Sequence, residues 1–243
     1  MPIQRLVVVA DAHLGPRTGP LEDALLRWLD EVPALGDALL LNGDLFGFWF
    51  TYRRAIPRAG IRVVARLAAL ARELPVLLVG GNHDRWGDSF WEREFGIRYS
   101  PRELRFELGT SKVLAIHGDG LPDPSWRTAL KQRVVSHPLA SLGYRLLPAE
   151  LGFRLAERFA GPGAPSPRLT RLTNERATLQ RVWAAERLRQ EPELGLLIMG
   201  HTHRAVAEEV APGRRYLNPG AWCSGYCYAL ATDRGVELRQ YPG

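Results

Sequence analysis

Residues 6–13 read Leu-Val-Val-Val-Ala-Asp-Ala-His, an apolar run that ends in a carboxylate and a histidine. Short apolar runs without polar alternation are typical of strands that are covered on both faces. Four further runs share this character, at residues 38–41, 76–79, 113–116 and 196–199. We therefore expect a core built on buried β-strands.

Amphipathic segments lie between these runs. Behind Pro20, which suits the first turn of a helix, apolar residues follow helical spacing; they are Leu21, Leu25, Trp28, Leu29 and Val32. Residues 61–71 repeat the same periodicity. Strands that alternate with helices predict an α/β architecture.

The pattern changes in the second half of the chain. Helical pieces over residues 125–160 are broken by Pro138, Gly143 and Pro148, and residues 161–167 are rich in glycine and proline. A long amphipathic helix is then expected from Pro167 to Gln190, with an apolar face made of Leu169, Leu172, Leu179, Val182 and Trp183.

We interpret residues 121–192 as a helical cap inserted into a single domain that spans residues 1–243. The tail, residues 205–241, mixes glycine, proline and aromatic residues and is expected to form short antiparallel strands.

The positive charge is concentrated in the expected cap. Residues 121–192 hold 12 Lys and Arg against 6 Asp and Glu, which accounts for the whole net charge of +6. Such a patch favours an anionic partner, namely a phosphate ligand, a lipid surface or nucleic acid. The alternative is a solvated helical surface that is rich in arginine.

Other features predict a cytoplasmic protein. No run of about 18 apolar residues predicts a membrane span, and residues 1–13 lack the pattern of a signal peptide. The two cysteines, Cys223 and Cys227, are too few for a disulfide scaffold, and we interpret them as packing residues.

Every apolar run ends in residues that can bind a metal. These residues are Asp11, His13, Asp44, Asn82, His83, Asp84, His117, His201 and His203. Five of the six histidines belong to this set, and His137 is interpreted as structural. Because open α/β sheets bind ligands beyond the carboxyl ends of their strands, clusters far apart in sequence can converge there.

The ligand types narrow the choice of metal. Imidazole nitrogens combined with carboxylate oxygens, without a thiolate, suit Mn, Fe, Co, Ni or Zn. Seven candidate ligands exceed the needs of one tetrahedral zinc and suit two divalent ions, with Mn as the first choice. The seven are Asp11, His13, Asp44, Asn82, His117, His201 and His203.

Taken in order, these motifs resemble the calcineurin-like metallophosphoesterase superfamily over most of the chain. The resemblance implies a four-layer α/β/β/α sandwich with two mixed sheets. It implies one metal held by Asp11, His13, Asp44 and His203, and a second held by Asp44, Asn82, His117 and His201. Asp44 would bridge the two metals, a hydroxide between them would attack phosphorus, His83 would be the acid or phosphate contact, and Asp84 would orient His83.

A closer resemblance is carried by residues 43–49, Gly-Asp-Leu-Phe-Gly-Phe-Trp, and by the tail motif Gly220-Ala221-Trp222. Both are similar to the UDP-2,3-diacylglucosamine pyrophosphatases of lipid A synthesis, which release UMP and a lipid monophosphate. The resemblance implies that residues 121–192 form a lid, in which apolar residues take acyl chains and arginines face phosphate or anionic lipid heads. Peripheral contact with the inner face of the membrane would follow.

Some residues keep alternatives open. His83 stands where many of those enzymes carry arginine, residues 121–126 differ from the stretch that usually follows the fourth motif, and Asn218-Pro219-Gly220 resembles general phosphodiesterases. The alternatives are a phosphodiesterase or phosphatase that acts on nucleotides or nucleic acid, and a non-catalytic basic binding protein. The latter needs no Asp/His set at strand ends. Residues 46–50 belong either to the core or to the wall of the site.

Overall fold

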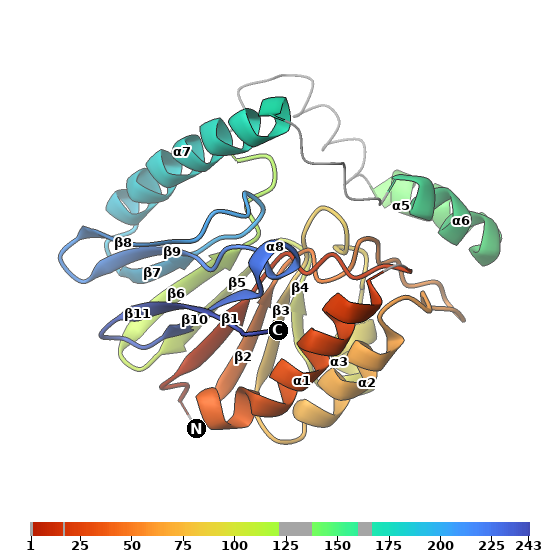
Figure 1. The fold of residues 1–243 in the computed structure, drawn as a ribbon, viewed down its shortest axis with the longest axis horizontal. Helices are drawn as coiled ribbons and strands as arrows, with labels where there is room; N and C mark the ends of the chain where they lie inside the picture. Colours follow the sequence, from red (N-terminus) through yellow and green to blue (C-terminus); the bar gives the residue numbers. More distant parts are fainter. Residues whose placement is uncertain (1, 17, 122–137, 160–166) are drawn as a thin grey trace.

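The computed structural model describes residues 2–16, 18–121, 138–159 and 167–243 (Figure 1). The first sheet has the order β11-β10-β1-β2-β3-β4. Its strands are β1 (Leu6–Val9), β2 (Ala38–Asn42), β3 (Val76–Val79), β4 (Arg98–Ser100), β10 (Cys227–Ala231) and β11 (Val236–Gln240). Neighbours from β1 to β4 are parallel, whereas β10 runs antiparallel to β1 and β11.

The second sheet has the order β5-β6-β7-β9-β8. Its strands are β5 (Glu103–Leu108), β6 (Ser111–Ile116), β7 (Leu194–Ile198), β8 (Val206–Ala211) and β9 (Arg214–Asn218). The pairs β6–β7 and β7–β9 are parallel, and the two edge pairs are antiparallel. All five apolar runs are strands, and the prediction of two mixed sheets is confirmed.

Helices complete the layers (Figure 1). They are α1 (Gly19–Leu35), α2 (Ile61–Leu70), α3 (Phe90–Phe95), α5 (Pro138–Arg145), α6 (Ala149–Phe159), α7 (Pro167–Gln190) and α8 (Trp222–Gly225). One core cluster joins α1 and α2 to the first sheet, a second lies between the sheets, and a third joins the second sheet to α7. The four-layer α/β/β/α sandwich is thus confirmed.

Helix α7 has its predicted bounds but not its predicted buried face. Gln180, Ala184 and Leu188 are buried against the second sheet, whereas Leu179 and Val182 are 44% and 64% exposed. The prediction was wrong for the last two because it assumed that only apolar residues face the core, while the structure buries a glutamine that bonds to a neighbouring loop.

Parts of the expected cap lie outside the described residues, including His137. The cap therefore stays a prediction over residues 121–192. Within the described ranges, no helix combines the length and the apolar character needed to cross a membrane.

Candidate metal centre

The metal-competent residues follow five strands that belong to both sheets. Asp11 and His13 come after β1, Asp44 after β2, and Asn82 after β3, all in the first sheet. His117 follows β6 in the second sheet, and His201 and His203 follow β7 there. The candidate centre therefore lies where the ends of the two sheets meet.

Asp44 lies in the middle of this group. Its carboxylate is 2% exposed, and its Oδ2 atom lies 3.2 Å from Nε2 of His117 and 3.8 Å from Nε2 of His13. The same oxygen lies 4.0 Å from Nε2 of His83. Burial disfavours the charged carboxylate, but the neighbouring imidazoles, His117 above all, hold the pKa of Asp44 below its ordinary value. One oxygen thus faces three ring nitrogens, as a shared ligand requires.

Asp11 makes a second set of close approaches. Its Oδ1 atom lies 3.3 Å from Nε2 of His203 and 3.8 Å from Nε2 of His13. Its Oδ2 atom accepts a hydrogen bond of 3.0 Å from the backbone N–H of His201. Asp11 therefore ties the end of β1 to the loop that carries the two histidines after β7.

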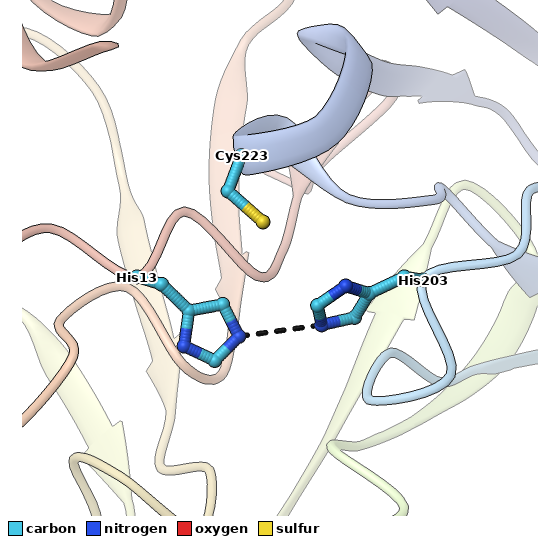
Figure 2. Close-up of side chains that lie close together, drawn as sticks. All are labelled: His13, His203 and Cys223. Carbon is cyan, nitrogen blue, oxygen red and sulfur yellow. Dashed lines mark hydrogen bonds between the residues drawn. The ribbon is translucent and has the colours of Figure 1, made fainter. Parts of the chain in front are cut away.

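Among the residues that the structure describes, three groups of donor atoms are close enough together to surround an ion. Within each group, all donor atoms lie within 4.8 Å of one another. The groups are Asp44 with His117 and His201, Asp44 with His13 and His83, and His13 with His203 and Cys223 (Figure 2). Asp44 belongs to two of the groups, and His13 to two.

Two buried atoms support the fit of a divalent cation. Nε2 of His117 and Oδ1 of Asn82 are buried, and neither has a hydrogen-bond partner within the described part of the chain. Nδ1 of His117 lies 2.9 Å from the carbonyl oxygen of Asn42, which leaves Nε2 directed at Asp44. Buried polar atoms nearly always have a hydrogen-bond partner. An imidazole nitrogen and an amide oxygen that lack one, beside two carboxylates, are therefore suited to coordinating a metal.

The protonation state of His201 also suits coordination. Burial, together with the charge of His117, lowers the pKa of His201 to about 4. The ring of His201 is therefore neutral at pH 7, the state in which an imidazole binds a metal. For His117 and His203, by contrast, the nearby carboxylates outweigh burial and raise the pKa, so these two rings would release a proton when an ion binds.

Backbone strain is concentrated at the same positions. Five of the seven candidate ligands adopt the left-handed conformation that non-glycine residues rarely occupy: φ is 54° at Asp11, 47° at His13, 51° at Asp44, 68° at His201 and 56° at His203. Such conformations cost about 1–3 kcal/mol each and cluster at functional sites. The fold holds these side chains in place at the expense of local backbone energy.

Two glycines permit the loops to approach each other. A Cβ atom at Gly81 would collide with the carboxylate of Asp44 and lie 2.6 Å from its backbone nitrogen. A Cβ atom at Gly43, where φ is 88°, would collide with the ring of His117. Glycine is therefore needed at both positions for Asp44 and His117 to lie as they do.

The carboxylate of Asp84 lies between two loops of the candidate centre. It is buried and accepts hydrogen bonds of 2.7 Å from the N–H groups of Gly81 and Leu45, which joins the loops after β2 and β3. The Nδ1 atom of His83 lies 2.8 Å from the carbonyl oxygen of Gly47. Burial and the charge of Asp44 raise the pKa of Asp84 to about 6. Asp84 thus fixes the loops that carry Asp44 and His83, and its role in orienting the His83 ring stays a prediction.

Residues 46–50 were expected to lie either in the core or in the wall of the site, and the structure divides them. Phe46 and Trp49 pack in the core against Trp91. Phe48 is only half-buried and contacts the rings of Trp86 and Tyr144. The backbone of the run also holds His83, because Trp49 donates a hydrogen bond of 2.9 Å to the His83 carbonyl.

Helix α7 supports the loop that carries His201 and His203. The fully buried Gln180 donates from Nε2 to the carbonyl of Gly200 at 3.2 Å. Its Oε1 atom accepts hydrogen bonds from Thr202, Tyr216 and Asn218. One glutamine therefore satisfies four groups beside the candidate ligands.

Replacing Gln180 with alanine is expected to destabilise the protein by about 1–3 kcal/mol, because several buried polar groups lose their partner. Metal affinity should fall about 10–100-fold, as is usual when support for a ligand is removed. Urea unfolding and metal titration measure the two effects. Gln190→Ala is the control, because Gln190 lies on the same helix and bonds to Glu186 at the surface. Unchanged metal affinity in Gln180→Ala would contradict the supporting role.

Sequence reasoning overlooked three contributors to the site. Cys223 was interpreted as a packing residue, yet its thiol lies with His13 and His203 (Figure 2). Its position directly after the motif Gly220-Ala221-Trp222 was the feature of the sequence that could have indicated a place in the site. Gln180 was overlooked because a polar residue in a surface-like helix carries no pattern, and the carbonyl of Gly47 because a backbone group is invisible in sequence.

The sandwich and the donor atoms at its strand ends together define the class of the protein, a metallophosphoesterase. Residues 4–205 match the family model described as calcineurin-like phosphoesterase. The chain therefore belongs to this family and is a phosphoester hydrolase that uses divalent metal ions.

Curated relatives align over nearly their whole length. The chain is 26% identical to a UDP-2,3-diacylglucosamine hydrolase of Porphyromonas gingivalis over 93% of each chain. It is 28% identical to one of an Enterobacter species, over 96% of this chain and 98% of the relative. Among solved structures, a phosphoesterase from E. coli aligns with a TM-score of 0.46 and 16% identity, over 98% of this chain and 99% of that one.

Proposed function

We propose that the chain hydrolyses the pyrophosphate bond of UDP-2,3-diacylglucosamine or a similar lipid-linked nucleotide at a centre of two metals. The position of Asp44 carries the two-metal proposal, because its Oδ2 atom faces ring nitrogens from both sheets. Asp11, His13, Asp44 and His203 would hold one ion, and Asp44, Asn82, His117 and His201 the other.

When bound, two such cations polarise phosphoryl oxygens and lower the pKa of water, which supplies a nucleophile near neutral pH. The residues of the chain do the remaining work. Asp44 and Asp11 would balance the charge of the ions. The carbonyl oxygen of Asn42, next to Nδ1 of His117, fixes the orientation of that ring. The contact between Nδ1 of His83 and the carbonyl of Gly47 leaves Nε2 facing Asp44. From this position His83 would donate a proton to the leaving oxygen.

An aromatic surface next to the centre supports a large substrate. Tyr144 of α5 lies 4.5 Å from Phe50 and 5.8 Å from Phe48, measured between ring centroids. Phe153 of α6 contacts Tyr52 in the same way. These contacts bring α5 and α6, which belong to the expected cap, against the loop that begins at Asp44.

The same helices offer both acyl-binding and anion-binding groups. Leu142, Leu146 and Leu151 are exposed, Leu146 by 80%. A cavity of about 310 Å³ is lined by Tyr52, Arg53, Arg54, Ala55, Arg145 and Ala149. Apolar side chains beside arginines suit a molecule that carries both acyl chains and phosphates.

A substrate panel tests the proposal. Purified protein loaded with Mn²⁺ is given bis-p-nitrophenyl phosphate, cyclic nucleotides, UDP-glucose and UDP-2,3-diacylglucosamine. We expect UMP release from the diacyl substrate to exceed that from UDP-glucose, which shares the nucleotide and lacks the acyl chains. Preferred cleavage of cyclic or simple diesters would instead support the general phosphodiesterase, which His83 and Asn218 favour. No hydrolysis of any phosphoester would contradict both.

Replacing Arg145 with glutamine tests the anion-binding role of the cap. Because Arg145 pairs with Asp88 in the free protein, a substrate phosphate would have to compete with that carboxylate. We expect kcat/KM for the lipid-nucleotide substrate to fall about tenfold or more, because hydrogen bonds to charged groups contribute about 1.5–3 kcal/mol. Hydrolysis of bis-p-nitrophenyl phosphate should not change. Arg62→Gln, which removes a surface arginine of α2, is the control. Equal turnover of the lipid substrate by Arg145→Gln would exclude this role.

A further inference from the structure

Cys223 is attached to the candidate centre through the backbone. The short helix α8 meets the end of β1, where Trp222 donates a hydrogen bond of 3.0 Å to the carbonyl of Ala10. The N–H of Cys223 donates a bond of 3.1 Å to the carbonyl of Asp11. The cysteine is therefore fixed against a residue that follows β1, although more than 200 positions separate them in the chain.

The side chain of Cys223 points toward two imidazoles. Figure 2 shows its sulfur directed at the space between the rings of His13 and His203. The Nε2 atoms of these two rings lie 3.3 Å apart, and Sγ together with a nitrogen of each ring forms a group within 4.8 Å. Cys223 is half-buried and forms no disulfide. Three candidate ligands, two imidazoles and one thiol, thus converge from the segments after β1 and β7 and from α8.

We propose that the thiolate of Cys223 is a further ligand of the ion held by Asp11, His13 and His203. The inference rests on the proposed two-metal function and extends its ligand set. The thiol releases its proton to solvent as the sulfur–metal bond forms. Because a thiolate is a soft ligand, this position should prefer Zn, Co or Fe to Mn, whereas the position of Asn82 and His117 lacks such a bias.

Cys227 supplies a matched control within the same segment. Its sulfur lies 3.6 Å from the carbonyl of Gly225 and is not part of any metal-competent group among the described residues. The two thiols are four positions apart and both half-buried, so they differ mainly in their neighbours.

Cobalt spectroscopy on the full-length protein tests the proposal. Co²⁺ is titrated into metal-free protein, and the near-ultraviolet band of thiolate-to-cobalt charge transfer is recorded. We expect the band in the wild type and in Cys227→Ser, and its loss in both Cys223→Ser and Cys223→Ala. A band that is absent from the wild type, or that persists in the Cys223 variants, overturns the inference.

Metal competition gives a second readout that does not depend on activity. In Cys223→Ser, the preference for Zn²⁺ over Mn²⁺ should fall at least about tenfold, since even groups that only support a ligand are worth about 10–100-fold in affinity. An unchanged preference overturns the inference. Circular dichroism shows whether each variant is folded, and Cys223→Ala provides a second replacement if serine is not tolerated.

The two proposals fail in different ways. Uptake of two ions and hydrolysis of phosphoesters without a thiolate band would leave the proposed function in place and refute the role of Cys223. Protein that binds no divalent metal would refute both.

Discussion

Replacement of Asp44 by alanine is expected to abolish phosphoester hydrolysis and to lower metal occupancy at the same time. The carboxylate lies within 4.0 Å of ring nitrogens from His13, His83 and His117, so its loss removes the proposed shared ligand and the negative charge that faces these rings. We expect kcat/KM to fall by at least about 10³-fold, which corresponds to roughly 4 kcal/mol of transition-state stabilisation. Elemental analysis of the purified variant measures the metal content.

A matched carboxylate controls for the change of charge. Asp30 lies on the surface of α1, where it pairs with Arg66, and Asp30→Ala should keep both activity and metals. Activity in Asp44→Ala would rule out the bridging role. Loss of activity with two ions still bound would restrict Asp44 to a role in the reaction.

Replacement of His83 by alanine should separate catalysis from metal binding. His83 is placed by the carbonyl of Gly47 and lies 4.0 Å from Asp44, at the margin of the group. A proton donor contributes about 10²–10⁴-fold to a rate, so kcat should fall by that factor while both ions stay bound. Steady-state assays measure kcat, and elemental analysis measures whether both ions stay bound.

A comparison of substrates with different leaving groups makes this test more specific. p-Nitrophenol leaves readily without a proton, so bis-p-nitrophenyl phosphate should lose less rate in His83→Ala than a substrate with an alkyl or sugar leaving group. An equal loss for all substrates would assign His83 to stabilising charge on the phosphoryl group. Loss of one metal would instead make His83 a ligand, in line with its place beside Asp44 and His13.

The strands and the candidate ligands were predictable because both follow local rules. Each apolar run is long enough to be a strand, and the carboxyl end of a parallel strand is where α/β sheets place their chemistry. Asp11 and His117 are far apart in sequence, yet both could be assigned to one site on this basis.

What escaped prediction depends on long-range contacts or on the backbone. The carboxylate of Asp84 bonds to backbone N–H groups of two loops, which no side-chain pattern reveals. Gln180 is buried because four groups of other segments converge on it. Cys223 lies beside two histidines because α8 docks on the end of β1. Left-handed conformations at Asp11 or His201 are equally invisible, since their sequence neighbourhood does not require them.

The division of the ligands between the two sheets has a consequence for the lifetime of the protein. Under the proposed ligand sets, the ions would join residues after β1 and β2 to residues after β6 and β7, and would therefore bind the native state but find no matching site in an unfolded chain. Stability then rises with the logarithm of free metal concentration, by about 2.7 kcal/mol at a hundred times the dissociation constant. Proteolysis in cells removes opened molecules, so scarcity of metal would reduce the amount of enzyme as well as its turnover. Supply of the ion would thereby set the abundance of this hydrolase without any dedicated regulator.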